Sequence, residues 1–376
     1  MKITEVQQYT VSQTLDEEFY FSQWHYSERT ICLVKITTDE GLYGWGEGYG
    51  PANVIKSAID FYRPLLIGQD PLHQENLWRA MYLRSLDYAR RGIMLSALSA
   101  LDIALWDLKG KILGQPVSVL LGGRKSEKVR AYATGLYFSE GDNLPQRLAD
   151  EALSYKQAGF EAVKMKVGLG LEKDVRNVQA VREVLGPGVE LMIDANHAFS
   201  LKEALQLARA VERYNIAWFE EPISPEDYEN YSELRLRTSI PIAGGECEYL
   251  RPGFLNLFKN RCVDIAQPDI CAAGGVTEVK KLMSMAQTFG VDIVPHSWGT
   301  GIALSAGLHL MSNWDSIPGR LFEPEPLIEL DRTENPLRDK LVTPAFVPEE
   351  GRIKVPDTPG LGVDVNEEQL NKFLEA

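Results

Sequence analysis

Short apolar runs alternate with amphipathic stretches from about residue 129 onward. The amphipathic stretches place apolar side chains at helical spacing, and they cover residues 146–157, 172–185, 201–214 and 276–289. The apolar runs between them have the short length of buried strands. This alternation of strand and helix predicts a series of parallel βα units.

The first third of the chain has a different pattern. Residues 30–36 are rich in strand-forming residues, and a turn signal at residues 39–41 leads into a second strand, which predicts a hairpin. Residues 52–125 follow helical periodicity. Within them, residues 96–110 are apolar on more than one side, which is typical of a mostly buried helix.

These two patterns divide the chain. We predict an N-terminal α+β domain at residues 1–125 and a second domain of βα units at residues 126–345. The tail at residues 346–376 is rich in proline and glycine, and we expect it to return to the N-terminal domain and complete it.

An aromatic-rich segment, residues 19–26, lies between the first predicted strands, and we expect a long loop there. Two interpretations remain open for its large side chains, which include Trp24, His25 and Tyr26. They could pack as a small satellite cluster, or they could form a lid over a substrate pocket, because long loops in compact domains are often functional.

One functional side chain ends nearly every apolar run in the second half of the chain. Consecutive members are 23 to 28 residues apart, close to the length of one βα unit, and they are Lys166, Asp194, Glu220, Glu246, Asp269 and His296. Parallel strands of a barrel end at the same rim, where barrel enzymes place their active sites. The spacing therefore predicts an active site at the C-terminal ends of successive strands.

Three members of this series are carboxylates on consecutive strands: Asp194, Glu220 and Glu246. Neighbouring strands lie about 4.8 Å apart, so the three side chains are expected to converge. Converging carboxylates repel one another unless a cation neutralises them. Oxygen ligands of this kind suit a hard ion such as Mg²⁺ or Mn²⁺. Glu221 is a weaker candidate, because side chains alternate along a strand and Glu220 and Glu221 cannot both point to the centre.

The remaining residues of the series are of types that can donate or accept protons. Lys164 and Lys166 share one face of a strand, and two adjacent ammonium groups near a cation are expected to have lowered pKa values. His296 lies one βα unit after Asp269, whose carboxylate would orient the imidazole. Counted around eight strands, Lys166 falls on about the second and His296 on about the seventh. We therefore expect them to face each other across the mouth of the barrel.

Composition narrows the function further. The chain has 376 residues and a net charge of −14, which argues against nucleic acid and anionic membranes as partners. The four cysteines lack CxxC spacing, as in reduced thiols of a cytoplasmic protein. We find neither a signal peptide nor an apolar run of the roughly 18 residues that a membrane span needs.

Together these motifs resemble the mandelate racemase subgroup of the enolase superfamily over nearly the whole chain. The matching positions are the helical segment 97–122, Lys164-Met165-Lys166, the three carboxylates, and the pair Asp269 and His296. The resemblance implies an α/β fold, a modified (β/α)7β TIM barrel with an α+β capping domain. It also implies Mg²⁺ and abstraction of the α-proton of a carboxylate substrate, giving a metal-stabilised enediolate as in other enolase-superfamily sites.

The subgroup usually carries a glutamate on the last barrel strand that hydrogen-bonds the substrate carboxylate. Glu323, Glu325 and Glu329 compete for this role, and we favour Glu329 because residues 327–330 form the best strand. Asn196 and Trp298, with the aromatic residues at 24–26, are candidates for contacts to substrate.

The resemblance is strongest to members that act on acid sugars. We expect dehydration of a sugar acid first. Cycloisomerisation of a lactone or anhydro sugar acid is the alternative, and racemisation or epimerisation is also compatible with two opposed bases. A non-catalytic barrel and a zinc-dependent hydrolase are less compatible with the motifs. Relatives commonly assemble, so we expect a homo-oligomer.

Overall fold

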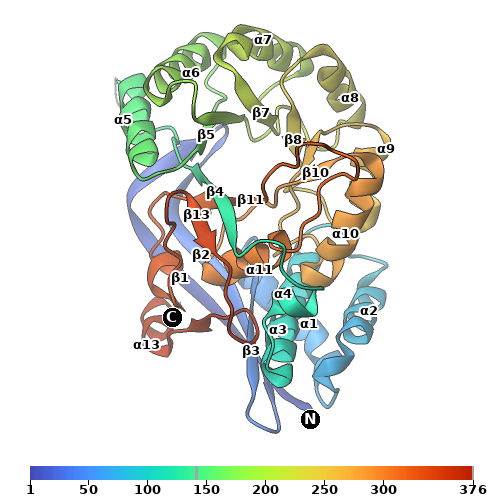
Figure 1. Cartoon of the computed structure of the whole chain (residues 1–376). Coiled ribbons are helices and arrows are strands. Elements are labelled where there is room, and N and C mark those ends of the chain that lie inside the picture. The colour runs from blue at the N-terminus through green and yellow to red at the C-terminus, as the bar shows by residue number, and fades with distance from the viewer. Residues whose placement is uncertain (140–142, 375–376) are drawn as a thin grey trace.

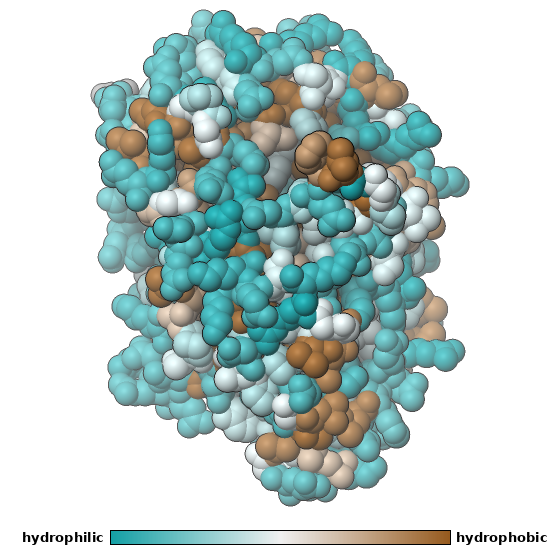
Figure 2. Space-filling view, in the orientation of Figure 1, coloured by the Kyte–Doolittle hydropathy of each residue, from teal (hydrophilic) through white to brown (hydrophobic). Residues whose placement is uncertain are grey.

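The computed structural model describes residues 1–139 and 143–374. Figure 1 shows helices and an antiparallel sheet beside a ring of parallel strands that is surrounded by helices. This arrangement confirms the predicted α/β class and the capped barrel. The face in Figure 2 is mainly hydrophilic, with separate apolar patches. No helix in the described part of the chain has the length and apolar character that a bilayer crossing requires.

The N-terminal domain begins with an antiparallel sheet. Its strands are β1 (Ile3–Phe21), β2 (Trp24–Thr38) and β3 (Tyr43–Gly48), in that order. The helices that follow are α1 (Ala52–Leu66), the 3-10 turn η1 (Pro71–His73), α2 (Gln74–Ser85), α3 (Ile93–Leu113) and α4 (Val117–Leu120). Most of α3 is buried, as its apolar character on more than one side predicted.

The prediction of a loop at residues 19–26 is wrong. Strands β1 and β2 continue through this segment as one long hairpin, in which Tyr20 pairs with His25 and Phe21 with Trp24. Aromatic residues favour a pleated, half-buried surface, so the composition that suggested a lid loop is also that of a strand. Only Ser22 and Gln23 form the turn, with Ser22 in the left-handed region at φ 34°.

The second sheet holds eight parallel strands, and a helix follows each of the first seven. The strands are β4 (Lys128–Thr134), β5 (Ala162–Lys166), β6 (Glu190–Asp194), β7 (Ile216–Glu220), β8 (Ile242–Gly244), β9 (Ile265–Ala266), β10 (Asp292–Ile293) and β11 (Leu327–Asp331). Their order is β10-β9-β8-β7-β6-β5-β4-β11, so the last strand lies beside the first. Lys166 therefore ends the second strand, and His296 follows the seventh, in the order expected.

The helices of the barrel are α5 (Leu144–Gln157), α6 (Leu171–Leu185), α7 (Leu201–Val211) with the 3-10 turn η2 (Glu212–Tyr214), α8 (Tyr228–Arg237), α9 (Leu250–Lys259), α10 (Gly275–Phe289) and α11 (Gly301–Met311). Four of them, α5, α6, α7 and α10, match the amphipathic stretches named from the sequence. The apolar faces of the barrel helices pack on the outside of the strands and form one large core with them.

Glycines bring the N-terminal sheet directly onto α3. A Cβ atom at Gly46 would lie 1.9 Å from the carbonyl oxygen of Ala100, which no other residue could tolerate. This approach holds the buried Glu47 against the barrel. Its carboxylate accepts hydrogen bonds from the backbone N–H groups of Thr300 (3.0 Å) and Ala303 (3.3 Å), at the start of α11.

The C-terminal tail joins both parts of the molecule. After the last barrel strand come α12 (Pro336–Lys340) and β12 (Val342–Thr343), and the tail itself contains β13 (Arg352–Lys354), β14 (Asp364–Val365) and α13 (Glu367–Phe373). β13 pairs with the barrel strand β4, whereas Leu374 forms a bridge to Val11 of β1. The Leu361 N–H also donates to the buried carboxylate of Asp107 in α3, at 2.8 Å. We keep 1–125, 126–345 and 346–376 as our proposed division into domains.

Candidate active site

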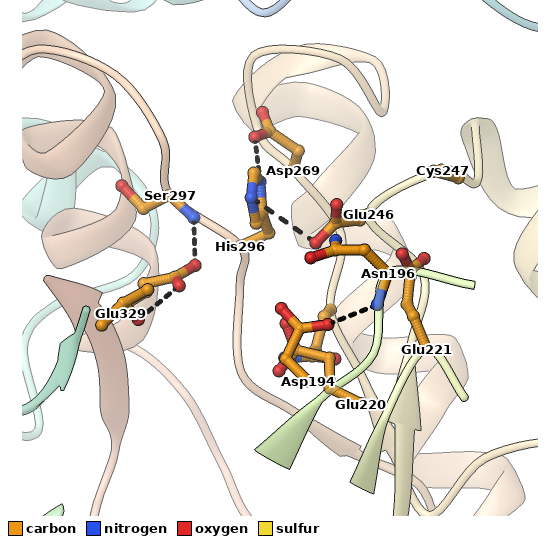
Figure 3. A network of polar contacts seen from close by, with 12 residues as sticks. Asp194, Asn196, Glu220, Glu221, Glu246, Cys247, Asp269, His296, Ser297 and Glu329 are labelled. Atoms are coloured by element: carbon orange, nitrogen blue, oxygen red, sulfur yellow. Dashed lines mark hydrogen bonds and ion pairs between the residues drawn. The ribbon is translucent and has the colours of Figure 1, made fainter. Parts of the chain in front are cut away.

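Functional side chains of neighbouring strands lie level with one another at the rim of the barrel. Lys166 of β5 is opposite Asp194 of β6, which is opposite Glu220 of β7. A cavity of about 50 Å³ opens at this rim. The charged and amide side chains that line it are Lys164, Lys166, Asp194, Asn196, Glu246, His296 and Glu329. Figure 3 shows most of these residues around one space.

Lysine ammonium groups contact one oxygen of Asp194, and a backbone N–H donates to the other. Lys166 Nζ lies 2.5 Å from Asp194 Oδ2, and the Asn196 N–H donates to Asp194 Oδ1 at 3.0 Å. Burial alone would raise the pKa of Asp194, but Lys166 and Lys164 outweigh it and lower the pKa to about 2. Asn196 also accepts a hydrogen bond from Lys166 Nζ at 2.6 Å, so it positions that amine.

Glu220 is turned into the barrel interior. It accepts hydrogen bonds from Lys164, from Trp218 Nε1 (2.9 Å) and from Gln267 Nε2 (2.6 Å). Burial raises its pKa to about 7, with repulsion from Asp194 in the same direction and Lys164 opposing both. This carboxylate does not line the cavity, although its register places it next to Asp194.

The three predicted metal ligands fit a hard dication by chemistry, and Asp194 and Glu220 are in register, but the three are less converged than we expected. Within residues 1–139 and 143–374, the one group of three ligating side chains whose donor atoms all lie within 4.8 Å of one another is a different one, His197, Glu221 and Cys247. Ammonium groups pair with two members of the predicted trio: Lys166 with Asp194, and Lys164 with Glu220. A dication at the trio would have to displace these contacts.

The expected lowering of the lysine pKa is wrong for Lys164. Burial lowers its pKa, but Glu220 and Glu329 outweigh burial, and the pKa lies well above its ordinary value. The prediction counted the two lysines as neighbours of each other and did not count the acids that surround them.

His296 forms a dyad with Asp269. Its Nδ1 lies 2.6 Å from Asp269 Oδ2, and its Nε2 lies 3.5 Å from Glu246 Oε2. The Cys271 N–H fixes the other oxygen of Asp269, at 2.7 Å. Burial lowers the pKa of His296, but Glu246 and the hydrogen bond to Asp269 outweigh burial and raise it to about 10.

Among the three last-strand glutamates, Glu329 is the one at the cavity. Thr134 Oγ1 donates to its Oε1 at 2.6 Å, and Lys164 Nζ lies 2.9 Å from the same oxygen. Glu323 and Glu325 are exposed, and Glu325 pairs with Arg352 on the surface. Burial raises the pKa of Glu329, but Lys164 and His296 outweigh burial and lower it to about 2.

Aromatic side chains form the roof of the cavity. Tyr26 and Trp298 line it, as predicted contacts to substrate should, and their ring centroids are 5.7 Å apart. Phe21, from the aromatic segment 19–26, also lines the cavity, and sequence reasoning missed two further lining residues, Tyr49 and Tyr137. Tyr49 follows β3 and packs edge-on against His296 at 5.3 Å, so only the packing of the two domains reveals it.

Trp24 and His25 are not at the cavity. Both residues belong to β2. They line a separate outer groove of about 960 Å³, together with residues of the loops that follow β4 and β5. Trp24 is 68% exposed. The turn between the strands bonds to the rim instead: Ser22 donates to the carbonyl oxygen of Ala195, and Gln23 donates to that of Asn196 at 3.4 Å.

Comparison with known proteins covers both domains. Residues 3–122 match the family model described as mandelate racemase / muconate lactonizing enzyme, N-terminal domain. Residues 147–369 match the model described as enolase C-terminal domain-like.

Individual relatives match over almost the full chain. D-galactarolactone cycloisomerase of Agrobacterium fabrum is 41% identical over 373 residues, 99% of each chain. Arabinonate dehydratase of Saccharolobus solfataricus is 37% identical over 347 residues, 91% of this chain and 90% of the relative. The crystal structure of 3,6-anhydro-D-galactonate cycloisomerase from Zobellia galactanivorans has a TM-score of 0.92 at 54% identity, covering 100% of both chains.

Proposed function

Because this chain is a lyase or isomerase that belongs to the mandelate racemase/muconate lactonizing enzyme group of the enolase superfamily, we propose that it is a cycloisomerase of a lactone or anhydro sugar acid. Sequence reasoning placed dehydration first. The relatives favour cycloisomerisation over dehydration. The 54% identical structure and the 41% identical relative are cycloisomerases, whereas the dehydratase is 37% identical. Dehydration of a sugar acid is our second candidate on the strength of that dehydratase.

One observation carries the proposal most directly. Lys166, from the second barrel strand, and His296, from the loop after the seventh, line the same buried cavity. Two groups that exchange protons on opposite sides of one carbon suit a reaction that removes an α-proton and then protonates a leaving group. We infer that the substrate carbon lies between them.

We propose Asp194, Glu220 and Glu246 as the ligands of a Mg²⁺ ion, the metal type that carboxylate donors prefer. The bound ion would offset the negative charge that develops on the substrate carboxylate, a contribution of several kcal/mol. Lys164 lies at the same wall and would hydrogen-bond that carboxylate, whereas the ionised Glu329 would accept a hydrogen bond from a substrate hydroxyl.

The proton steps then follow from the two opposed groups. One of them, Lys166 or His296, takes the proton from the carbon next to the carboxylate. The bond between the β-carbon and the ring oxygen breaks, and its electron pair stays on that oxygen, which takes a proton from the opposite group. The resulting enol takes up a proton at carbon and becomes a 2-keto acid. No atoms are gained or lost overall, so substrate and product are isomers.

Substrate size sets a further condition. Pockets for small ligands usually measure about 300–1,000 Å³, far more than the 50 Å³ found here. We propose that the tip of the hairpin at Ser22 and Gln23 moves away from the rim when substrate enters. Asn196, Tyr26 and Trp298 remain candidates for substrate contacts, whereas Trp24 and His25 are withdrawn from that role.

Mass spectrometry with three substrates tests the proposal. The enzyme, with Mg²⁺, is incubated separately with D-galactarolactone, 3,6-anhydro-D-galactonate and D-arabinonate, with Lys166→Ala as the inactive control. We expect a 2-keto product of unchanged mass from one of the first two. A product lighter by one water from D-arabinonate alone would select dehydration and overturn cycloisomerisation.

A further inference from the structure

A second group of ligating side chains lies directly outside the proposed Mg²⁺ site. It consists of His197, Glu221 and Cys247. Each lies one to three residues after one of the predicted metal ligands Asp194, Glu220 and Glu246. Glu221 directly follows Glu220, the last residue of β7, and consecutive side chains of a strand point to opposite faces. In Figure 3, Glu221 and Cys247 lie to the right of Asp194, away from Glu329.

The distances within this group suit a tetrahedral transition-metal ion. His197 Nε2 lies 3.1 Å from Glu221 Oε2 and 3.7 Å from Cys247 Sγ. Ligand atoms bound to tetrahedral zinc through Cys, His and Glu are about 3.3–3.6 Å apart, given the usual bond lengths. All three donor atoms already lie within 4.8 Å of one another, so little movement is needed.

Two polar atoms in the group are buried without a well-aligned hydrogen bond. Glu221 is 1% exposed, and neither its Oε2 nor His197 Nδ1 makes a well-aligned hydrogen bond among the described residues, although His197 Nε2 lies 3.1 Å from that Oε2. A buried carboxylate oxygen without a well-aligned donor is costly, and a bound cation would satisfy it. A small cavity of about 10 Å³ borders Glu221 and Cys247, though not His197.

The backbone presents these side chains in fixed positions. His197 and Glu221 adopt left-handed conformations, with φ 66° and 38°, and the His197 N–H donates to the carbonyl oxygen of Glu221 at 2.8 Å. His197 and Cys247 are partly exposed, which gives an ion a path from solvent. Cys247 is also the one cysteine of the four that is not buried.

We propose that His197, Glu221 and Cys247 form a second cation site for a borderline dication such as Zn²⁺, separate from the all-carboxylate site for Mg²⁺. Thiolate and imidazole select transition metals, whereas carboxylates alone select hard ions. The ion takes the place of the Cys247 thiol proton, which is released to solvent, and leaves a fourth position open for water.

Co²⁺ provides the test because thiolate bound to Co²⁺ has a charge-transfer band that carboxylate ligands do not produce. Co²⁺ is titrated into the full chain in the presence of saturating Mg²⁺. We expect the band with one equivalent of Co²⁺, its loss in Cys247→Ser, and at least tenfold weaker binding in His197→Gln. Zn²⁺ should displace Co²⁺ and abolish the band.

Matched variants separate this site from its neighbours. Cys32→Ala removes a buried thiol of β2 and should keep the band. Asp194→Asn removes a proposed Mg²⁺ ligand and should keep it too, so the result does not depend on the proposed function. The melting temperature shows whether Cys247→Ser is folded. If it is not, His197→Gln tests the site independently. Absence of the band in the wild type, or its persistence in Cys247→Ser, would overturn the proposal.

Discussion

Lys164 Nζ lies 2.9 Å from Glu329 Oε1, and both side chains are 1% exposed. This ion pair joins β5 to β11 across the first strand of the barrel, β4, whose Thr134 donates to the same glutamate. The other oxygen of Glu329 accepts the N–H of Ser297, the residue after His296. The last strand is therefore connected both to the lysine pair and to the loop that carries the histidine.

Glu329→Gln should reduce kcat/KM by about a hundredfold or more, because it removes the charge partner of a buried lysine and a proposed substrate contact. Glu325→Gln is the matched control. It changes a glutamate of the same segment that pairs with Arg352 at the surface, and it should leave kcat/KM within about twofold. Equal losses in the two variants would contradict the assignment of Glu329.

Lys166→Ala and His296→Asn should each lower turnover by at least about a hundredfold, because each removes one of the two proton-transfer groups. The two variants should differ in deuterated water. The variant that keeps the abstracting base should still exchange the substrate α-proton, measured by proton NMR. Near-normal turnover in both variants would contradict the assignment of two opposed proton-transfer groups.

Chelation of metal should abolish turnover, and Mg²⁺ or Mn²⁺ should restore it, because carboxylate sites prefer hard ions. Glu246→Gln should need a much higher Mg²⁺ concentration for the same rate, which a Mg²⁺ titration of activity measures. Glu226→Gln is the control, since Glu226 is an exposed acid near β7. Restoration by Zn²⁺ alone would contradict a Mg²⁺ site.

Thermal stability should fall in acid because of His309, a buried residue of α11. Its Nδ1 accepts the Ser118 N–H at 3.1 Å, and its Nε2 donates to the carbonyl oxygen of Leu361 at 3.1 Å. Burial lowers its pKa to about 4 in the folded protein. Because this value lies below the unfolded value of about 6.5, the neutral ring stabilises the fold above pH 6.5, and this stabilisation is lost as pH falls toward 4.

The contribution of His309 is about 3 kcal/mol at neutral pH. The melting temperature of the wild type should therefore drop between pH 6.5 and 4.5 by more than that of His309→Gln, which cannot titrate. His73→Asn, at an exposed position, should keep the wild-type pH dependence. Parallel curves for wild type and His309→Gln would refute this account.

The sequence predicted the barrel because its signals are periodic. Parallel strands repeat at the length of one βα unit, and each ended in a polar residue such as Asp194 or Asp269, so the strand count and the rim followed together. The placement of Glu329 at the last strand also followed from a local pattern, since its flanking residues form a short apolar run typical of a buried strand whereas those around Glu325 do not.

Contacts between distant segments could not be predicted in the same way. The aromatic composition of residues 19–26 is compatible with a loop or a strand, and only the pairing of β1 with β2 decides between them. Phe21 lines the cavity, whereas Trp24, its partner on the neighbouring strand, lines the outer groove. The group of His197, Glu221 and Cys247 was missed because its members are spread over three loops and match no local metal-binding spacing.

The interleaving of the tail with the N-terminal sheet bears on how the protein is made. The bridge from Leu374 to Val11 and the bond from Leu361 to Asp107 join residues that are synthesised far apart in time. Domains generally fold as units during translation, N-terminal first. Here the sheet that holds Val11 lacks these partners until residues 361–374 have been made, so a chain that stops before residue 361 would leave the N-terminal domain incomplete.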